Sequence, residues 1–180
     1  MAVNIVYFVH GTTTDNEAKL CSGWREATLS DLGRMQAHKL GNTSRKRGDR
    51  FDVVISSDLQ RAVETSNIAF PECEKITDKR LRECNYGDLD GEHKSLVVYE
   101  DHIDGAFPNG ESLKDVESRI REFVQFLKDN YDGQTVAIIA HRAPQLAFDV
   151  VLKGKTWEEA NKEDWRKHGG WQPGWEYEIK

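Results

Sequence analysis

The chain of 180 residues contains 31% charged residues and has a net charge of −6, which argues against a nucleic-acid partner, because binding to a phosphate backbone requires a basic surface. Its longest apolar runs have five or six residues, too few to cross a bilayer, and no basic and apolar signal region opens the sequence. We therefore expect no membrane contact and a cytoplasmic location. The length suits one domain spanning residues 1–180, since no linker rich in Pro, Gly or Ser divides it.

The spacing of cysteines and histidines predicts neither disulfides nor a metal site. Cys21, Cys73 and Cys84 form no CxxC pair and suit free thiols in a reducing compartment. The six histidines show no HExxH or paired-ligand spacing. We therefore expect no metal and no cofactor.

The residues from Ile5 to Val9 are mostly β-branched or aromatic and predict a strand that is buried on both faces. This strand runs directly into His10, which is followed by Gly11 and three threonines. The carboxyl end of a parallel strand is the usual position for ligands in open α/β folds, so we expect chemistry at His10. The alternative is that His10 is only a hydrogen-bonded residue at a strand end.

A loop over residues 17–29 and a helix with Ser30 as its N-cap are expected next. The helix should end near Gly41 or in the basic run that follows, residues 45–50. Basic residues at a helix end complement the helix dipole, and we favour this interpretation over an anion-binding patch.

A second short strand is predicted over residues 51–55. Ser57 and Gln60 have the spacing of a capping box, so a helix is expected to begin there. Pro71 should stop it, and Arg61 lies in its first turns.

Residues 73–77 suit a short edge strand, and residues 85–110 suit an irregular loop with room for a short helix. Ser112 and Asp115 then form a start signal for the clearest helix of the chain, whose apolar residues recur at helical spacing up to Asn130.

A third buried strand, residues 135–140, again ends in a histidine, His141. The alternation of strands and helices predicts an α/β fold with a mainly parallel central sheet and helices on both faces. The carboxyl ends of such strands lie on one edge of the sheet, so His10, the turn at residues 56–61 and His141 should converge there.

Four of the five tryptophans lie in the last 26 residues. Trp157, Ala160 and Trp165 suit a helix, and residues 171–175 suit a turn into a last strand, residues 175–179. Core packing accounts for most of these aromatic side chains, and stacking on a base or an aromatic leaving group is the alternative.

Two histidines and an arginine at a helix N-terminus define an anion pocket, and phosphate is its natural ligand. A neutral imidazole can attack phosphorus, which divides hydrolysis into formation of a phosphoenzyme and its breakdown by water, without a metal. Glu83 can supply the proton that the leaving oxygen needs once burial or the phosphate charge favours its protonated form. The alternative for Glu83 is a surface carboxylate paired with Arg80 or Arg82.

Several ordered blocks resemble the histidine phosphatase superfamily, also called phosphoglycerate-mutase-like. They are Val9-His10-Gly11 with Asn16; Gly23-Trp24 with Leu29-Ser30 and Gly33; Ser56 to Ala62 with Thr65; Leu81-Arg82-Glu83 with Gly87, Leu89 and Gly91; Pro108 and Gly110 to Ser112 with Asp115 and Arg119; and Ala140-His141. The resemblance implies a three-layer fold. It implies that His10 is the phosphorylated nucleophile, Glu83 the proton donor, and Arg61 and His141 phosphate ligands.

The predicted substrate-binding residues lie around the first strand end and the second histidine: Gly11, Thr13, Asn16 and Arg142. Two of the residues at these ends depart from the family pattern. Val9 stands where the family has an arginine, whose planar fork binds phosphate oxygens bidentately, and Arg142 stands where glycine is common. Either Arg142 substitutes for the missing arginine, or it points outward or pairs with a surface carboxylate.

The predicted function is that of a metal-independent phosphomonoester hydrolase that forms a phosphohistidine on a small phosphorylated metabolite. The segment between Gly91 and Glu111 is shorter than the insertions of most family mutases, which favours a phosphatase over the alternative, a phosphoglycerate-mutase-type phosphotransferase. A phospho-ligand binding module with impaired turnover is the second alternative, because of Val9. Whether the chain forms a homodimer is left open.

Overall fold

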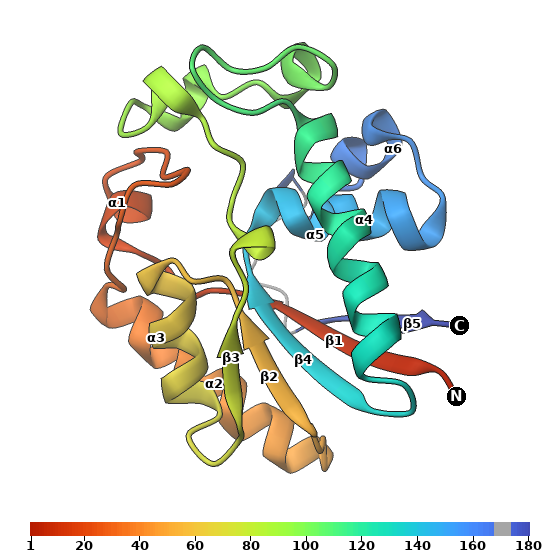
Figure 1. The fold of residues 1–180 in the computed structure, drawn as a ribbon. Coiled ribbons are helices and arrows are strands. Elements are labelled where there is room, and N and C mark those ends of the chain that lie inside the picture. The colour runs from red at the N-terminus through yellow and green to blue at the C-terminus, as the bar shows by residue number, and fades with distance from the viewer. Residues whose placement is uncertain (168–173) are drawn as a thin grey trace.

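The computed structural model describes residues 1–167 and 174–180, and its centre is a five-stranded sheet in the order β3-β2-β4-β1-β5 (Figure 1). The strands are β1 (Val3–Val9), β2 (Val53–Ser56), β3 (Lys75–Thr77), β4 (Thr135–Ala140) and β5 (Trp175–Ile179). The first four are parallel to one another, and β5 runs antiparallel to β1. The prediction of a mainly parallel sheet in an α/β fold is therefore confirmed.

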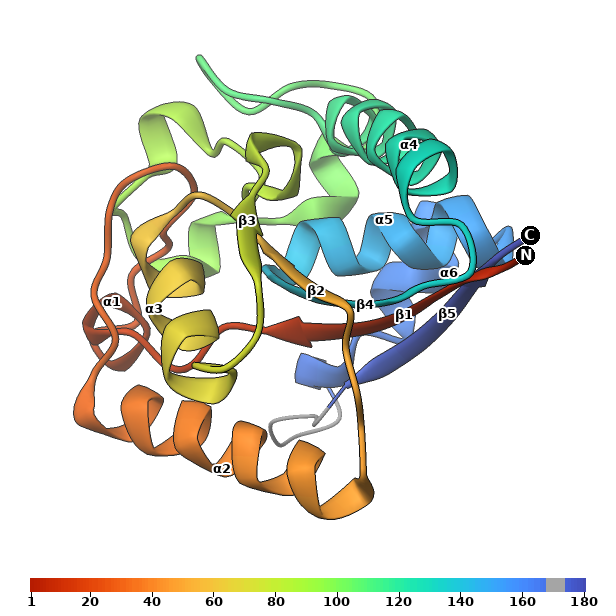
Figure 2. The ribbon, with the colours of Figure 1, turned by 60° about the horizontal axis from the view of Figure 1, so that its bottom comes forward.

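Helices cover both faces of the sheet, which gives three layers. The α-helices are α1 (Thr14–Glu17), α2 (Asp31–Arg47), α3 (Gln60–Ala69), α4 (Leu113–Asn130), α5 (Arg142–Lys153) and α6 (Trp157–Lys162). The 3-10 helices are η1 (Lys79–Leu81), η2 (Gly87–Leu89), η3 (Lys94–Leu96), η4 (Tyr99–His102) and η5 (Trp165–Lys167). Figure 2 shows α2 and α3 on one side of the sheet and α4, α5 and α6 on the other. No helix in the described part of the chain is long and apolar enough to cross a membrane.

Alternate side chains of β1 supply the two halves of the core, because successive residues of a strand point to opposite faces. Tyr7 packs against Phe148 of α5, with ring centroids 5.3 Å apart. Its neighbour Phe8 packs on the other face against Phe70, which ends α3, with centroids 5.8 Å apart. All four of these rings are almost fully buried. Burial on both faces explains why the strand is a continuous apolar run.

Two of the predicted helix starts are confirmed in atomic detail. The Ser30 hydroxyl accepts a hydrogen bond from the Gly33 N–H at 3.2 Å. Ser112 and Asp115 form a reciprocal capping box at the start of α4. The helix that begins after Ser30 passes Gly41 and ends within the basic run, where Gly48 closes it in the left-handed conformation at φ 80°.

The predicted capping box of Ser57 and Gln60 is wrong. Helix α3 begins at Gln60, and its N-cap is Leu59, which makes no side-chain cap. The Ser57 hydroxyl instead accepts a hydrogen bond from the Leu59 N–H, so it stabilises the turn before the helix. The end of α3 before Pro71 agrees with the prediction.

The edge position of β3, the extent of β4 and the last strand agree with the predictions. Two short elements differ from them: α1 precedes the expected loop, and α6 ends at Lys162 so that Trp165 lies in the separate turn η5. Helix α5, which follows His141, was not among the expected elements. The predicted turn at residues 171–175 falls largely outside the described residues.

The strand order brings the predicted site residues together. Strand β4 lies between β1 and β2, and Val9 is paired with Ala140 while Ser56 is paired with Ile139. The residues that follow these strands, His10, His141 and Ser57, therefore emerge side by side at the carboxyl edge of the sheet.

Two glycines allow helix α2 to approach this edge closely. A Cβ atom on Gly11 would overlap the Gly33 carbonyl oxygen, and a Cβ atom on Gly33 would overlap the Thr12 carbonyl oxygen. The backbone of the turn after β1 thus rests directly on the first turn of α2. This contact holds the residue that precedes the turn, His10, in place.

Candidate active site

The His10 imidazole lies at the end of β1 and is held by its own neighbour. Its Nδ1 is 2.7 Å from the Gly11 carbonyl oxygen. Because a carbonyl oxygen only accepts hydrogen bonds, Nδ1 carries the proton and Nε2 keeps its lone pair in the neutral ring. The Gly11 N–H in turn donates to the Thr65 hydroxyl of α3 at 3.0 Å, which fixes the backbone that orients the ring.

His141 lies beside His10, with ring centroids 5.0 Å apart. The Tyr7 hydroxyl donates to the His141 carbonyl oxygen at 2.8 Å and accepts from its N–H at 3.1 Å, so strand β1 clamps the backbone of the second histidine. The ring is 0% exposed, and neither of its nitrogens has a hydrogen-bond partner among the described residues. Buried polar atoms are usually paired, so this ring is suited to a ligand.

Arg61 projects from the first turn of α3 and is 1% exposed. Its guanidinium donates hydrogen bonds to three carbonyl oxygens of the loop before α2: Gly23 at 2.7 Å, Ser22 at 2.9 Å and Arg25 at 3.1 Å. A guanidinium has five N–H donors, so two remain for an anion.

Burial and the positive charge of Arg61 determine the charge state of both histidines. Burial, followed by the charge of Arg61, lowers the pKa of His10 from its ordinary value to about 3. The same two causes, in the same order, lower the pKa of His141, and the His10 ring adds to the effect. Both rings are therefore neutral near pH 7, which is the form in which an imidazole is a nucleophile.

Glu83 is a buried carboxylate at the amino end of α5, and neither Arg80 nor Arg82 pairs with it. Its Oε1 accepts hydrogen bonds from the Cys84 N–H and the Ala143 N–H, both at 2.9 Å, and its Oε2 accepts one from the Arg142 N–H at 3.2 Å. Arg80 pairs instead with Asp78, and Arg82 with Asp58. The alternative interpretation of Glu83 as a paired surface carboxylate is wrong.

These side chains border one hollow of about 220 Å³ at the carboxyl edge of the sheet. Of the predicted residues, the hollow is lined by His10, Asn16, Arg61, Glu83 and Arg142. His141 does not line the hollow, but its ring lies beside that of His10. Gly11 and Thr13 do not line it: the Gly11 N–H is used by Thr65, and the Thr13 hydroxyl caps α1 by accepting from the Asn16 N–H at 3.0 Å.

Arg142 borders the hollow but is committed to a carboxylate. Its Nε donates to Asp164 at 2.6 Å, its Nη2 donates to Asn161 at 3.3 Å, and its guanidinium lies 4.0 Å above the Tyr99 ring centroid. Pairing with a carboxylate was one of the two alternatives for Arg142, but Asp164 is buried rather than on the surface.

Several residues that position the site were not among the candidates. Asp90 accepts hydrogen bonds from the N–H groups of Gly23, Trp24 and Arg25, and thereby shapes the loop whose carbonyl oxygens hold Arg61. Arg119 of α4 donates to the Glu83 carbonyl oxygen at 3.0 Å. Each residue has a local signal in the sequence: Asp90 precedes Gly91 in a turn, and Arg119 lies in a block that matches the family. Neither signal predicts which backbone groups the side chain binds.

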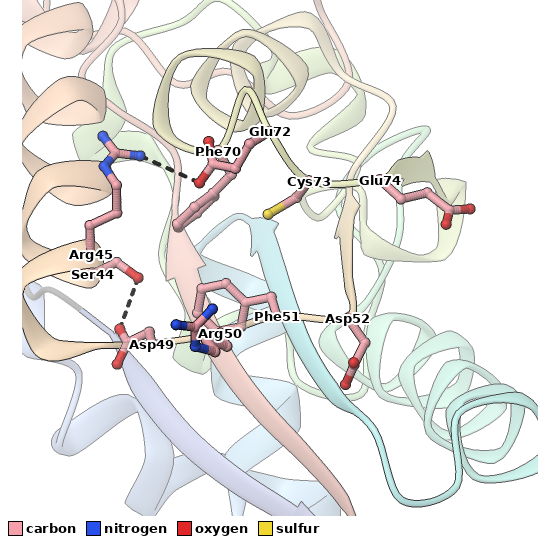
Figure 3. Close-up of a pocket in the computed structure, with 10 residues that line it drawn as sticks. All are labelled: Ser44, Arg45, Asp49, Arg50, Phe51, Asp52, Phe70, Glu72, Cys73 and Glu74. Carbon is pink, nitrogen blue, oxygen red and sulfur yellow. Dashed lines mark hydrogen bonds and ion pairs between the residues drawn. The ribbon is translucent and has the colours of Figure 1, made fainter.

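A second hollow, of about 340 Å³, lies between the end of α2, the residues before β2 and the turn after α3 (Figure 3). Within it, Arg45 lies 3.5 Å from Glu72, and the Ser44 hydroxyl donates to Asp49 at 2.9 Å. It is at the amino end of β2, and no histidine lines it. The hollow beside His10 is therefore the better candidate for chemistry.

In the part of the chain that the structure describes, no three His, Cys, Asp or Glu side chains come together as ligands for a metal ion. The three cysteines are free thiols. The chemistry that the site offers is thus that of two neutral imidazoles, a buried guanidinium and a carboxyl group.

Comparison with known proteins identifies the family. The family model for the histidine phosphatase superfamily (branch 1) matches residues 6–171. The phosphoglycerate mutase of Schizosaccharomyces pombe is 31% identical over 172 residues, covering 86% of this chain and 82% of the mutase. A 2,3-bisphosphoglycerate-dependent phosphoglycerate mutase of Bartonella bacilliformis is 32% identical over 176 residues, covering 88% of this chain and 85% of that protein.

A solved structure gives the same fold. A mycobacterial glucosyl-3-phosphoglycerate phosphatase superposes with a TM-score of 0.80 at 26% identity, covering 88% of this chain and 86% of that one. The chain belongs to the histidine phosphatase superfamily, and it is an enzyme of the class that acts on phosphate monoesters. The three-layer fold predicted from the resemblance is confirmed.

The low pKa of His10 predicts that acid destabilises the protein. The unfolded ring takes up a proton near its ordinary pKa of about 6.5, whereas the folded ring stays neutral down to about 3. The stability is therefore fully present above pH 6.5 and is lost as the pH falls toward 3. Between pH 7.5 and pH 5, His10 alone should lower the free energy of unfolding by about 2 kcal/mol, measured by urea denaturation.

The replacement His10→Asn should remove this share of the pH dependence, while replacement of the exposed His38 by Asn should leave it intact. Identical pH dependence of the His10→Asn variant and the unaltered protein would contradict the burial of a neutral His10.

Proposed function

We propose that this chain is a phosphomonoester hydrolase that transfers the phosphoryl group of a small phosphorylated metabolite first to His10 and then to water, without a metal. One observation carries the proposal: the unpaired, buried ring of His141 faces a neutral His10 whose Nδ1 already has its partner. If a phosphoryl group binds between the two rings, its phosphorus faces the Nε2 lone pair of His10. Its oxygen atoms can then accept hydrogen bonds from His141 and from the two remaining N–H groups of Arg61.

In the first step, the Nε2 lone pair of His10 attacks phosphorus and the bond between phosphorus and the ester oxygen breaks. The electron pair of that bond stays on the leaving oxygen, which takes a proton from the Glu83 carboxyl group and departs as an alcohol. Oε1 of Glu83 already accepts two N–H groups, whereas Oε2 accepts one at 3.2 Å, so Oε2 is the oxygen that can carry the proton. The Gly11 carbonyl oxygen stabilises the positive ring through Nδ1–H.

In the second step, the Glu83 carboxylate takes a proton from water as the water oxygen attacks phosphorus. The bond between phosphorus and Nε2 breaks, and its electron pair returns to His10. Inorganic phosphate leaves, and Glu83 is again protonated for the next cycle. One group thus acts as general acid and then as general base.

The size of the hollow supports a small substrate. A volume of about 220 Å³ holds a phosphoryl group and a short alcohol portion. The rim adds Leu20, Cys21, Tyr86, Lys94 and Val97, which come from the two loops around the site. These loops would contact the leaving group and determine which phosphorylated metabolite is accepted.

The names of the sequence relatives favour a second candidate. Phosphoglycerate mutases are 31% and 32% identical to this chain, so His10 could pass its phosphoryl group to a second hydroxyl of an acceptor instead of to water. Incubation of the phosphorylated enzyme with 2- or 3-phosphoglycerate separates the two reactions, since a mutase yields a phosphoglycerate isomer and a hydrolase yields inorganic phosphate.

The replacement His10→Ala should abolish turnover of p-nitrophenyl phosphate in the presence of EDTA. The reason is that no other described side chain that lines the hollow is an imidazole with a free nitrogen lone pair. Release of p-nitrophenol measures the rate. The replacement of exposed His38 by Ala is the matched control and should retain the full rate. Full turnover by the His10→Ala variant would exclude the phosphohistidine route, and an inactive unaltered enzyme would favour a binding module.

The replacement Glu83→Gln should slow the hydrolysis of an alkyl phosphate by about 100-fold or more, because an alkoxide leaving group needs a proton. The loss on p-nitrophenyl phosphate should be below about tenfold, since nitrophenolate leaves without one. Phosphate release on both substrates gives the comparison, with exposed Glu122→Gln as the control. Equal losses on the two substrates would show that Glu83 only supports the structure.

A further inference from the structure

The positive side chains around the hollow differ in how many hydrogen bonds and ion pairs they already make with protein oxygen atoms. Arg61 holds backbone carbonyl oxygens, Arg142 holds Asp164, and Lys167 lies 3.3 Å from Glu100. Among the described residues, no carboxylate or carbonyl oxygen pairs with the side chain of Arg166. Its guanidinium lies near the ring of its own neighbour Trp165, at 5.4 Å from the centroid.

Arg166 occupies a particular place relative to the strand that carries His10. It borders the hollow with His10, Asn16, Arg61 and Glu83, and it also borders an adjoining hollow with Val9, Thr12 and Trp165. Val9 precedes His10 and is apolar and 3% exposed, so this side of the site receives no charge from β1. Arg166 approaches the same side from the segment after α6.

The buried side chain of Asp164 holds the backbone of Arg166 in place. Asp164 is buried, and its Oδ1 accepts a hydrogen bond from the Arg166 N–H at 3.0 Å. Its Oδ2 accepts the 2.6 Å hydrogen bond from Arg142 Nε. The Trp165 ring packs on Trp175 of β5, with centroids 5.8 Å apart. One carboxylate therefore links the turn that carries Arg166 to the first residue of α5, next to His141.

The charge of Arg166 also reaches the two histidines. After burial and Arg61, Arg166 is among the causes that lower the pKa of His10, and it is among the causes that lower the pKa of His141. Lys94 borders both hollows as well, but its charge is not among the causes acting on either ring. A guanidinium is also better suited than an ammonium to two oxygen atoms of one phosphoryl group.

We propose that Arg166 binds the phosphoryl group on the side of the site where Val9 contributes no charge, so that the C-terminal segment completes the phosphate-binding set. The proposal rests on the proposed phosphatase function. It assigns the compensation for Val9 to Arg166 rather than to Arg142, whose guanidinium is held by Asp164 and Asn161.

The test compares Arg166→Ala with Lys162→Ala, which removes the same charge from an exposed position on α6. Arg166→Ala should lower kcat/KM on p-nitrophenyl phosphate by about tenfold or more, the effect of a charge-assisted contact, and should weaken inhibition by orthovanadate to a similar degree. Arg166→Lys should give an intermediate loss. Lys162→Ala should change neither quantity. A purely structural role would lower the unfolding temperature and leave vanadate inhibition unchanged.

A second variant pair tests the compensation. Val9→Arg should change the rate little in the unaltered enzyme, where two guanidinium groups would compete for one phosphate, but should restore most of the rate lost in Arg166→Ala. Such non-additivity is expected for residues that share a ligand. If the Val9→Arg variant does not fold, the rate of Arg166→Lys and the inhibition by vanadate still show whether Arg166 binds the phosphoryl group.

If the Arg166→Ala and Lys162→Ala variants have the same rate and the same inhibition by vanadate, the proposal for Arg166 is overturned, while the phosphatase function stands. If the unaltered protein hydrolyses no phosphate monoester, the proposed function fails and calorimetric binding of inorganic phosphate decides the role of Arg166: weaker binding by Arg166→Ala supports it, and equal binding overturns it.

Discussion

The buried guanidinium of Arg61 is the interaction on which the rest of the site depends. A charge removed from water is costly unless it is hydrogen-bonded, and here three carbonyl oxygens of the loop at residues 22–25 accept hydrogen bonds from the guanidinium. Asp90 shapes that loop from outside by accepting three of its N–H groups. The fixed positive charge has two consequences: it adds to burial, the larger cause, in keeping both imidazoles neutral, and it leaves two N–H donors for an anion.

A neutral histidine pair beside a fixed cation resolves the apparent conflict between binding phosphate and attacking it. If the imidazoles were protonated, they would attract a phosphate but could not act as nucleophiles. In the proposed reaction the two tasks are separate: the Nε2 of His10 keeps its lone pair because Nδ1–H donates to the Gly11 carbonyl oxygen, and the arginines provide the positive charge. The C-terminal segment belongs to this arrangement, since Asp164 joins the turn of Arg166 to Arg142.

Features that depend on neighbouring residues could be predicted from the sequence. The Ser112 and Asp115 capping box acts over three positions, and the convergence of His10 and His141 follows from parallel strands that end in histidines. The partners of Arg142 and Glu83 could not be predicted, because Asp164 is 22 residues from Arg142 and the N–H of Ala143 is 60 residues from Glu83. Those contacts depend on how α5 and the C-terminal segment pack, and no local pattern encodes that packing. The Thr13 hydroxyl instead serves a local contact, because it accepts a hydrogen bond in the first turn of α1, and Thr13 does not line the hollow beside His10.

The protonation state of the His10 ring decides whether it can be the nucleophile. Nitrogen-15 NMR of the histidine side chains in the free protein distinguishes the two neutral tautomers from the imidazolium. We expect a His10 ring with a protonated Nδ1 and an unprotonated Nε2 that does not titrate between pH 8 and pH 5, because its pKa is about 3. A His10 ring that is an imidazolium at pH 7, or a neutral ring with its proton on Nε2, would contradict nucleophilic attack by His10, because neither form has a lone pair on Nε2.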